Sequence, residues 1–296
     1  MFRPFTTAQA REVGLTPDTV RTRRVRRVHQ GVYVESFLEP GLELDVAAAR
    51  LVLPTDALLD GVSALHALGV EVGDAHPLRF VSTHPHQVRR PGVHVRRVSS
   101  LPPGTQDGLV APAHAFLAAA ADLDLVELVA AGDWLVRLDL TSWAELVDVT
   151  SAARGRHVRL ARRAAGLVRD RVDSPQETRL RLCVVLAGLP EPEVNPVIAV
   201  GGRRVGRVDL LLRRWRVVLE YEGDQHRTDK RQWNVDIGRQ EQLGEGEWTL
   251  VRITHQRMEH PRAVVRSVVR ALRSGGWEGP DPVFDAEWHQ LFPTAR

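Results

Sequence analysis

Apolar and polar positions repeat with helical or strand periods along most of the chain, and these periods predict its elements. Between residues 40 and 150 they predict helices at 42–52, 60–68, 111–121 and 123–138 and strands at 78–83 and 92–98. Next comes an arginine-rich helix at 151–170. From Ser174 onward the pattern predicts helices at 175–187, 229–243 and 261–273 and strands at 194–200, 205–212, 216–222 and 248–254. Short loops marked by glycine or proline join these last elements, which favours a compact α/β unit built on a β-meander.

The pattern of residues 5–34 predicts two short helices and a hairpin. Thr6 or Thr7 can begin a helix that Gly14 ends, and Thr16 can begin a second one. Residues 25–34 alternate around a glycine, which is typical of a β-wing. Guanidinium groups on the second helix can reach phosphates or guanine edges in a major groove. The arginines expected to bind nucleic acid here are Arg21, Arg23, Arg24 and Arg26.

This segment resembles the winged helix-turn-helix at the amino terminus of abortive-infection-type antitoxins and their actinobacterial relatives. The stretch from Leu51 through Gly69 is similar to the middle region of the same proteins. The resemblance implies DNA binding and allows a toxin or another protein as partner. The alternative is a small helical cap that touches no DNA.

Composition narrows the class of protein. The chain is 43% hydrophobic and 26% charged, which is an ordinary globular composition and argues against disordered, collagen-like and coiled-coil proteins. Cys183 is the single cysteine, so neither an intramolecular disulfide framework nor a cysteine-based zinc cluster is expected. The amino terminus lacks the apolar run of a signal peptide, and the apolar stretch 110–138 carries four acidic residues. We therefore expect a cytoplasmic protein with no membrane segment.

Charge is segregated along the chain. Residues 1–30 hold seven arginines against two acidic residues, and residues 151–175 repeat that excess, whereas residues 31–150 hold seven basic against sixteen acidic residues. Of the 40 basic residues only Lys230 is lysine, so 39 are arginine. Basic blocks of this kind indicate a nucleic-acid partner, although a solvated arginine-rich surface would give the same pattern.

Three carboxylates stand within the apolar strands of the carboxy-terminal unit. If the hairpin turns at Arg214-Trp215, or closes through a longer loop in the same register, Asp209 lies opposite Glu220. Alternation then puts Glu222 on the face of Glu220. Like charges so close repel unless a cation lies between them, and an all-oxygen ligand set selects Mg²⁺ or Mn²⁺. Shared coordination would bring the three carboxylates within about 5 Å of one point.

An aspartate ending one strand and an acid on the next is the layout of the PD-(D/E)xK nuclease superfamily. More closely, the segment 174–273 resembles the very-short-patch-repair-endonuclease-like domain of unknown function that is common in actinobacteria. The resemblance implies a restriction-endonuclease-like fold, with Asp209 and Glu220 as metal ligands. Glu222 occupies the position of the superfamily's lysine, so another group must serve the scissile phosphate. The candidates are His226 as general acid or base, Arg227 and Lys230 as phosphate contacts, and Asp236 and Arg239 as supporting residues on a helix.

Glu177 has two interpretations that do not exclude each other. Ser174 and Glu177 have capping-box spacing, in which the glutamate reaches back to the Ser174 N–H. The family resemblance makes Glu177 a carboxylate on a helix close to the metal. A further pair, His84 and His86, has the appearance of a metal site but lacks a third ligand nearby.

We therefore predict a multi-domain α/β protein. Its parts are a winged helix-turn-helix (1–38), an α+β middle region (39–150), a basic helical linker (151–173), an endonuclease-like domain with a mixed central sheet (174–275) and a tail (276–296). The favoured hypothesis is a DNA endonuclease that uses Mg²⁺ or Mn²⁺, in repair or defence. The alternative is an antitoxin-like transcriptional regulator whose nuclease fold is catalytically inactive.

Overall fold

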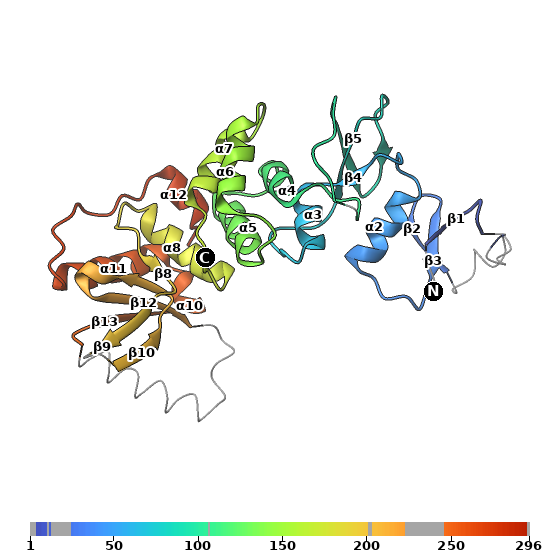
Figure 1. The fold of residues 1–296 in the computed structure, drawn as a ribbon. Coiled ribbons are helices and arrows are strands. Elements are labelled where there is room, and N and C mark those ends of the chain that lie inside the picture. Colours follow the sequence, from blue (N-terminus) through green and yellow to red (C-terminus); the bar gives the residue numbers. More distant parts are fainter. Residues whose placement is uncertain are drawn as a thin grey trace. The chain divides into compact units, whose positions relative to one another are not determined.

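The computed structural model describes residues 4–10, 12, 25–105, 107–200, 203–222 and 246–294. The chain is a mixed α/β protein, as predicted, and it divides into two compact units (Figure 1). The amino-terminal unit comprises Met1–Leu123 and Leu140–Gly166, and the carboxy-terminal unit comprises Asp124–Asp139 and Leu167–Arg296. Among the described helices, none has the length and apolar character needed to cross a bilayer.

The first sheet of the amino-terminal unit has the order β1-β3-β2 and contains the predicted hairpin. Its strands are β1 (Phe5–Thr6), β2 (Val25–His29) and β3 (Val32–Glu35). Gly31 turns the hairpin with a φ of 79°, a left-handed conformation that glycine adopts without strain. After β1 the chain makes a turn, in which Thr6 Oγ1 accepts the Gln9 N–H at 3.3 Å while Gln9 Oε1 accepts the Thr6 N–H at 3.0 Å. These bonds have the pattern expected of Thr6 at the start of a helix, but the rest of that predicted helix, at 11 and 13, lies outside the described residues. The predicted second helix lies outside the described residues.

The second sheet of this unit has the order β4-β5-β7-β6. Its strands are β4 (Leu58–Leu59), β5 (Leu78–Ser82), β6 (Arg89–Arg90) and β7 (Val93–Arg97). The helices of the unit are α2 (Leu42–Arg50), α3 (Gly61–Ala67), α4 (Pro112–Ala119), α6 (Trp143–Ala152) and α7 (Val158–Leu167). These elements confirm the helices and strands predicted between residues 40 and 121. β5 and β7 run parallel, with Ser82 opposite Arg97.

The single helix predicted over 151–170 is wrong, because the chain turns between α6 and α7. Gly155 has a φ of 115° and His157 a φ of 61°, and neither value continues a helix. Two arginines stabilise the break by donating to carbonyls at the end of α6: Arg154 to residues 151–153 and Arg162 to residues 150, 151 and 153. Part of the basic block is therefore used in capping α6.

The carboxy-terminal unit is built on a mixed sheet of order β13-β12-β11-β8, in which β12 and β13 are parallel and the other pairs are antiparallel. The strands of the unit are β8 (Glu193–Val194), β9 (Val197–Val200), β10 (Arg203–Arg207), β11 (Leu210–Leu212), β12 (Val217–Glu222) and β13 (Thr249–Thr254). Its helices are α5 (Leu125–Arg137), α8 (Pro175–Val185), α10 (His255–Met258), α11 (Pro261–Ser274) and α12 (Ala286–Leu291). α8 and α11 contact each other and both pack on β12 (Figure 1).

Two predicted strands are each divided in the structure. The strand predicted at 194–200 breaks at Asn195, whose φ is 49° and which precedes a proline. The strand predicted at 205–212 breaks at Asp209, between β10 and β11. The helix predicted at 229–243 lies outside the described residues.

The register of β11 and β12 is the one predicted. Leu210 pairs with Leu219 and Leu212 with Val217, so the next residues along are Asp209 and Glu220. The connection is the longer one, a 3₁₀ turn η1 (Arg213–Trp215) followed by Arg216 at a φ of 53°. This register brings the carboxylates of the two strands to one end of the hairpin.

Candidate active site

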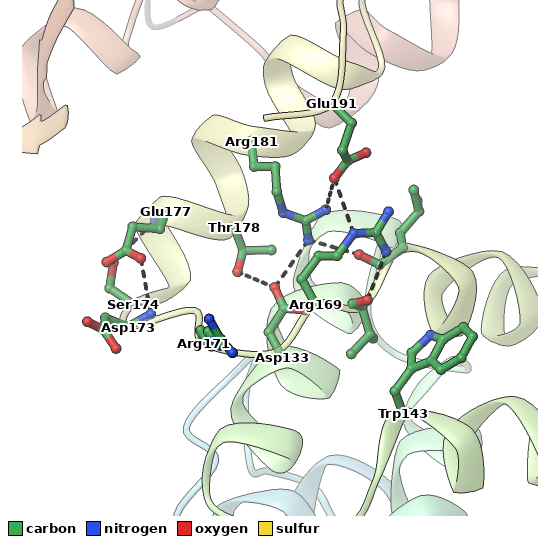
Figure 2. A network of polar contacts seen from close by, with 12 residues as sticks. Asp133, Trp143, Arg169, Arg171, Asp173, Ser174, Glu177, Thr178, Arg181 and Glu191 are labelled. Atoms are coloured by element: carbon green, nitrogen blue, oxygen red, sulfur yellow. Dashed lines mark hydrogen bonds and ion pairs between the residues drawn. The ribbon is translucent and has the colours of Figure 1, made fainter. Parts of the chain in front are cut away.

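Glu177 is a buried carboxylate in the first turn of α8. Its side chain accepts the Asp173 N–H at 3.0 Å and the Ser174 hydroxyl at 3.0 Å, while Ser174 Oγ accepts the Glu177 N–H at 3.2 Å. The capping interaction is therefore present, but the glutamate reaches the N–H of Asp173 and not that of Ser174. Figure 2 shows Glu177 beside Asp173 and Ser174 at the start of the helix.

Asn195 completes the surroundings of Glu177. Its Nδ2 donates to Glu177 Oε2 at 2.6 Å and to the Arg171 carbonyl at 2.7 Å, and its backbone N–H donates to the Asp209 carbonyl at 2.8 Å. Asn195 is buried and in the left-handed conformation that asparagine tolerates. It therefore ties the start of α8 to the chain segment that carries Asp209.

The carboxylate of Asp209 is directed at β12. Asp209 Oδ2 accepts the backbone N–H of Tyr221 at 2.8 Å. Burial raises the pKa of Glu177; the Asp173 N–H opposes this shift, and the nearby charge of Asp209 adds to it. Two carboxylates from separate elements thus influence each other electrostatically.

Glu220 and Glu222 lie on one face of β12, because side chains alternate along a strand. Arg252 on β13 is the register partner of Glu220, and its Nε lies 3.6 Å from Glu222 Oε1. Arg252 was not identified from the sequence, since only the parallel pairing of β12 with β13 brings it beside the two glutamates. It places a guanidinium next to Glu222.

Tyr221 points to the opposite face of β12. Its hydroxyl lies 3.3 Å from Nδ1 of His255, the first residue of α10. The backbone N–H of Tyr221 contacts Asp209, and its hydroxyl contacts His255. Tyr221 therefore connects the Asp209 carboxylate to a histidine that the sequence analysis did not identify.

Shared coordination of one metal by Asp209, Glu220 and Glu222 stays a prediction. Within the described residues, no group of three or more histidine, cysteine, aspartate or glutamate side chains is arranged to hold a metal ion. Two of the three carboxylates have partners within the protein: Asp209 accepts the Tyr221 N–H, and Glu222 pairs with Arg252. The charge of Asp209 also acts on the carboxylate of Glu177.

A buried ion network holds α8 against α5 (Figure 2). Arg181 is fully buried and lies 3.3 Å from Asp133 Oδ2 and 3.1 Å from Glu191 Oε1. Asp133 also accepts the Thr178 hydroxyl and the Arg169 N–H, each at 2.7 Å. Burial raises the pKa of Asp133 to about 6, although the Arg181 charge and these hydrogen bonds oppose the shift. This network fixes the helix that presents Glu177.

Arg26 is the one described residue of the predicted nucleic-acid contacts. It lies on β2, and its guanidinium donates to the Leu38 carbonyl at 3.2 Å. The other predicted site residues lie outside the described residues: Arg21, Arg23, Arg24, His226, Arg227, Lys230, Asp236 and Arg239.

Comparison of the chain with protein-family models, curated proteins and solved structures gave no match.

Proposed function

We propose that the chain is a DNA endonuclease that hydrolyses phosphodiester bonds with the help of Mg²⁺ or Mn²⁺. The observation that carries this proposal is the electrostatic coupling of Asp209 and Glu177 at the point where β11 leaves β12. The charge of Asp209 adds to the raised pKa of Glu177, so a hard cation between the two carboxylates would relieve their repulsion. Mg²⁺ needs only one or two carboxylates beside water and substrate phosphate.

In this proposal Asp209 and Glu220 hold the ion, with Glu177 as a third negative charge beside them. When bound, the cation lowers the pKa of a water molecule and neutralises charge on the phosphate. Asn195 and the Asp173 N–H keep the Glu177 carboxylate in place through hydrogen bonds.

Arg252 takes the electrostatic role of the absent lysine. Its guanidinium lies on the same face as Glu220 and Glu222 and can donate to a phosphate oxygen through a planar fork. A carboxylate at position 222 cannot donate to that charge, but it can orient the arginine beside it.

The test is a plasmid-nicking assay with Mg²⁺ or Mn²⁺ on the wild-type chain and on Asp209→Asn and Glu220→Gln. Nicking that is abolished by chelator and by either substitution supports the proposal. Arg213→Ala is the matched control, because Arg213 pairs with Glu193 at the loop end of the hairpin and should leave the activity intact. Equal activity of the wild type and Asp209→Asn would reject the assigned site.

A second candidate function is an antitoxin-like regulator that binds DNA without cutting it. Glu222 at the position of the lysine favours it, since an inactive descendant would tolerate that change. Protection of the chain's own promoter in a footprint, without metal-dependent cleavage, would support regulation.

A further inference from the structure

A polar hollow lies in the amino-terminal unit, where β5 and β7 end side by side. It has a volume of about 350 Å³, within the range of pockets that bind small molecules. The residues that line this hollow, here called the His84 pocket, are Ser82, His84, His86, Gln87, Val88, Val95 and Arg97.

The His84 pocket is lined by cationic and hydrogen-bond-donating groups. Residues 79–97 contain five arginines and three histidines and no acidic residue, although they belong to the most acidic part of the chain. Arg97 donates to the Pro85 carbonyl at 2.9 Å, and the rings of His84 and His86 are 5.7 Å apart. Among the described residues, no carboxylate forms an ion pair with any of these three side chains.

One carboxylate fixes the base of the pocket without entering the lining. Asp56 accepts the Ser82 hydroxyl at 2.7 Å, and the Thr83 N–H and hydroxyl at 2.8 and 2.6 Å. These hydrogen bonds hold the pKa of Asp56 below its usual value, and the bond from the Thr83 hydroxyl has the largest effect. The loop after β5 is therefore held in shape before any ligand arrives, which lowers the entropy cost of binding.

The lining selects an anion over a metal ion. A guanidinium provides a planar fork that matches phosphate oxygens. Nδ1 of His84 lies 3.1 Å from the His86 carbonyl oxygen and 3.3 Å from the His86 nitrogen. Nε2 carries a proton that it can donate in two forms of the ring: the neutral tautomer that accepts the His86 N–H, and the imidazolium, which donates to the carbonyl. Val88 and Val95 add an apolar wall, so the lining suits a ligand with a charged end and a small organic body.

We propose that the His84 pocket binds a phosphomonoester, with Arg97 and His84 on the phosphate and the two valines against the organic part. Such a group occurs on free nucleotides and on 5′-phosphorylated DNA ends. The site is separate from the carboxylates of the proposed endonuclease, and it can be present or absent whether or not the chain cleaves DNA.

Calorimetric titration of the full chain tests the proposal with four probes: AMP, adenosine, and one short oligodeoxynucleotide with and without a 5′-phosphate. We expect saturable binding of AMP or of the phosphorylated oligonucleotide, and at least about tenfold weaker binding of its phosphate-free counterpart. Binding of AMP points to a free nucleotide. Binding confined to the phosphorylated oligonucleotide points to a DNA end.

Variants locate the binding. Arg97→Ala and His84→Gln should each lower the affinity for the probe that binds by at least about tenfold. Arg89→Ala removes the same charge outside the lining and should change this affinity by less than about twofold. Thermal unfolding of each variant checks that the chain is folded, and either pocket variant suffices for the test. The proposal is overturned if no phosphorylated probe binds at about 1 mM, if the unphosphorylated oligonucleotide binds as well as the phosphorylated one, or if Arg89→Ala weakens binding as much as Arg97→Ala.

Discussion

The carboxylate of Asp209 accepts the backbone N–H of Tyr221 at 2.8 Å, so a side chain replaces the main-chain acceptor where β11 leaves β12. Asp209 therefore has a structural role as well as its proposed chemical one. The two roles can be separated, because the hydrogen bond needs only an oxygen whereas cation binding needs a charge.

Asp209→Asn keeps the acceptor oxygen and removes the charge. We expect metal-dependent nicking to be lost and the free energy of unfolding to change by less than about 1 kcal/mol. Asp209→Ala removes the acceptor as well, so it should lose nicking and also destabilise the chain by about 1–3 kcal/mol. Urea unfolding together with the nicking assay distinguishes the two. Equal destabilisation by both substitutions would contradict the structural role.

Arg252→Gln tests the role of the guanidinium beside Glu220 and Glu222. If Arg252 stabilises charge on the phosphate, this substitution should lower the nicking rate by about 10²–10³-fold with little change in DNA affinity. Arg252→Lys keeps the charge without the fork and should retain part of the rate. A uniform loss of DNA affinity at an unchanged cleavage rate would show that Arg252 only binds DNA.

The sequence predicted most of the elements and the register of the hairpin. Alternation of apolar residues in β11 and β12 is a local signal, and the pairing of Leu210 with Leu219 follows from it. The breaks were harder to predict. Asp209 and Asn195 interrupt apolar runs through contacts with each other's segment, and such contacts depend on tertiary packing, not on local preference.

The candidate site was only partly predictable. Glu177, Asp209 and Glu220 are acids in apolar or capping positions, which is a signal that a single sequence can show. Arg252 has no such signal, because its place beside Glu220 depends on a parallel pairing between strands far apart in the chain. The same pairing explains why Glu222 lies beside a guanidinium.

Asn195→Asp should destabilise the chain in a pH-dependent manner. The new carboxylate would replace a donor that lies 2.6 Å from Glu177 Oε2, and aspartate tolerates the left-handed backbone at this position. Burial already raises the pKa of Glu177, and a second buried charge would raise this pKa further. A raised folded-state pKa gives stability that is present at low pH and is lost as pH rises through that pKa.

We therefore expect Asn195→Asp to lower the free energy of unfolding by about 2–4 kcal/mol at pH 8 and by clearly less at pH 5. Urea unfolding at the two pH values measures this. Asn195→Ala is the control, because it removes the donor without adding a charge and should show a weaker dependence on pH. If Asn195→Asp lowered the free energy of unfolding equally at both pH values, repulsion between the new carboxylate and Glu177 would be contradicted.

Asp133→Asn should remove a pH-dependent contribution to stability. The folded-state pKa of Asp133 is about 6, above its ordinary value of 3.8, so the folded chain takes up this proton before the unfolded chain does. As pH falls from about 6 to about 4, this group adds about 1.4 kcal/mol of stability per pH unit, and this is lost again as pH rises. The difference in unfolding free energy between the wild type and Asp133→Asn should therefore grow as pH is lowered from 7 to 5. A difference that shrinks over this range would mean that the pKa is lowered and the ion pair with Arg181 dominates.

Gly275→Ala should destabilise the carboxy-terminal unit through a clash at the hairpin turn. A Cβ at Gly275 would lie 2.3 Å from the carbonyl oxygen of Trp215, which is part of η1 and belongs to the backbone, so it has little freedom to move. We expect a loss of about 1–3 kcal/mol in urea unfolding. Gly276→Ala is the matched comparison, because a Cβ at Gly276 would have open space but the backbone φ is 85°. Backbone strain alone should then lower the free energy of unfolding by only about 1 kcal/mol.

Gly275→Ala should also lower nicking, whereas Gly276→Ala should not, since η1 sets the register that places Asp209 against β12. A larger effect of Gly276→Ala on either measurement would show that packing of α11 against the turn does not hold the register.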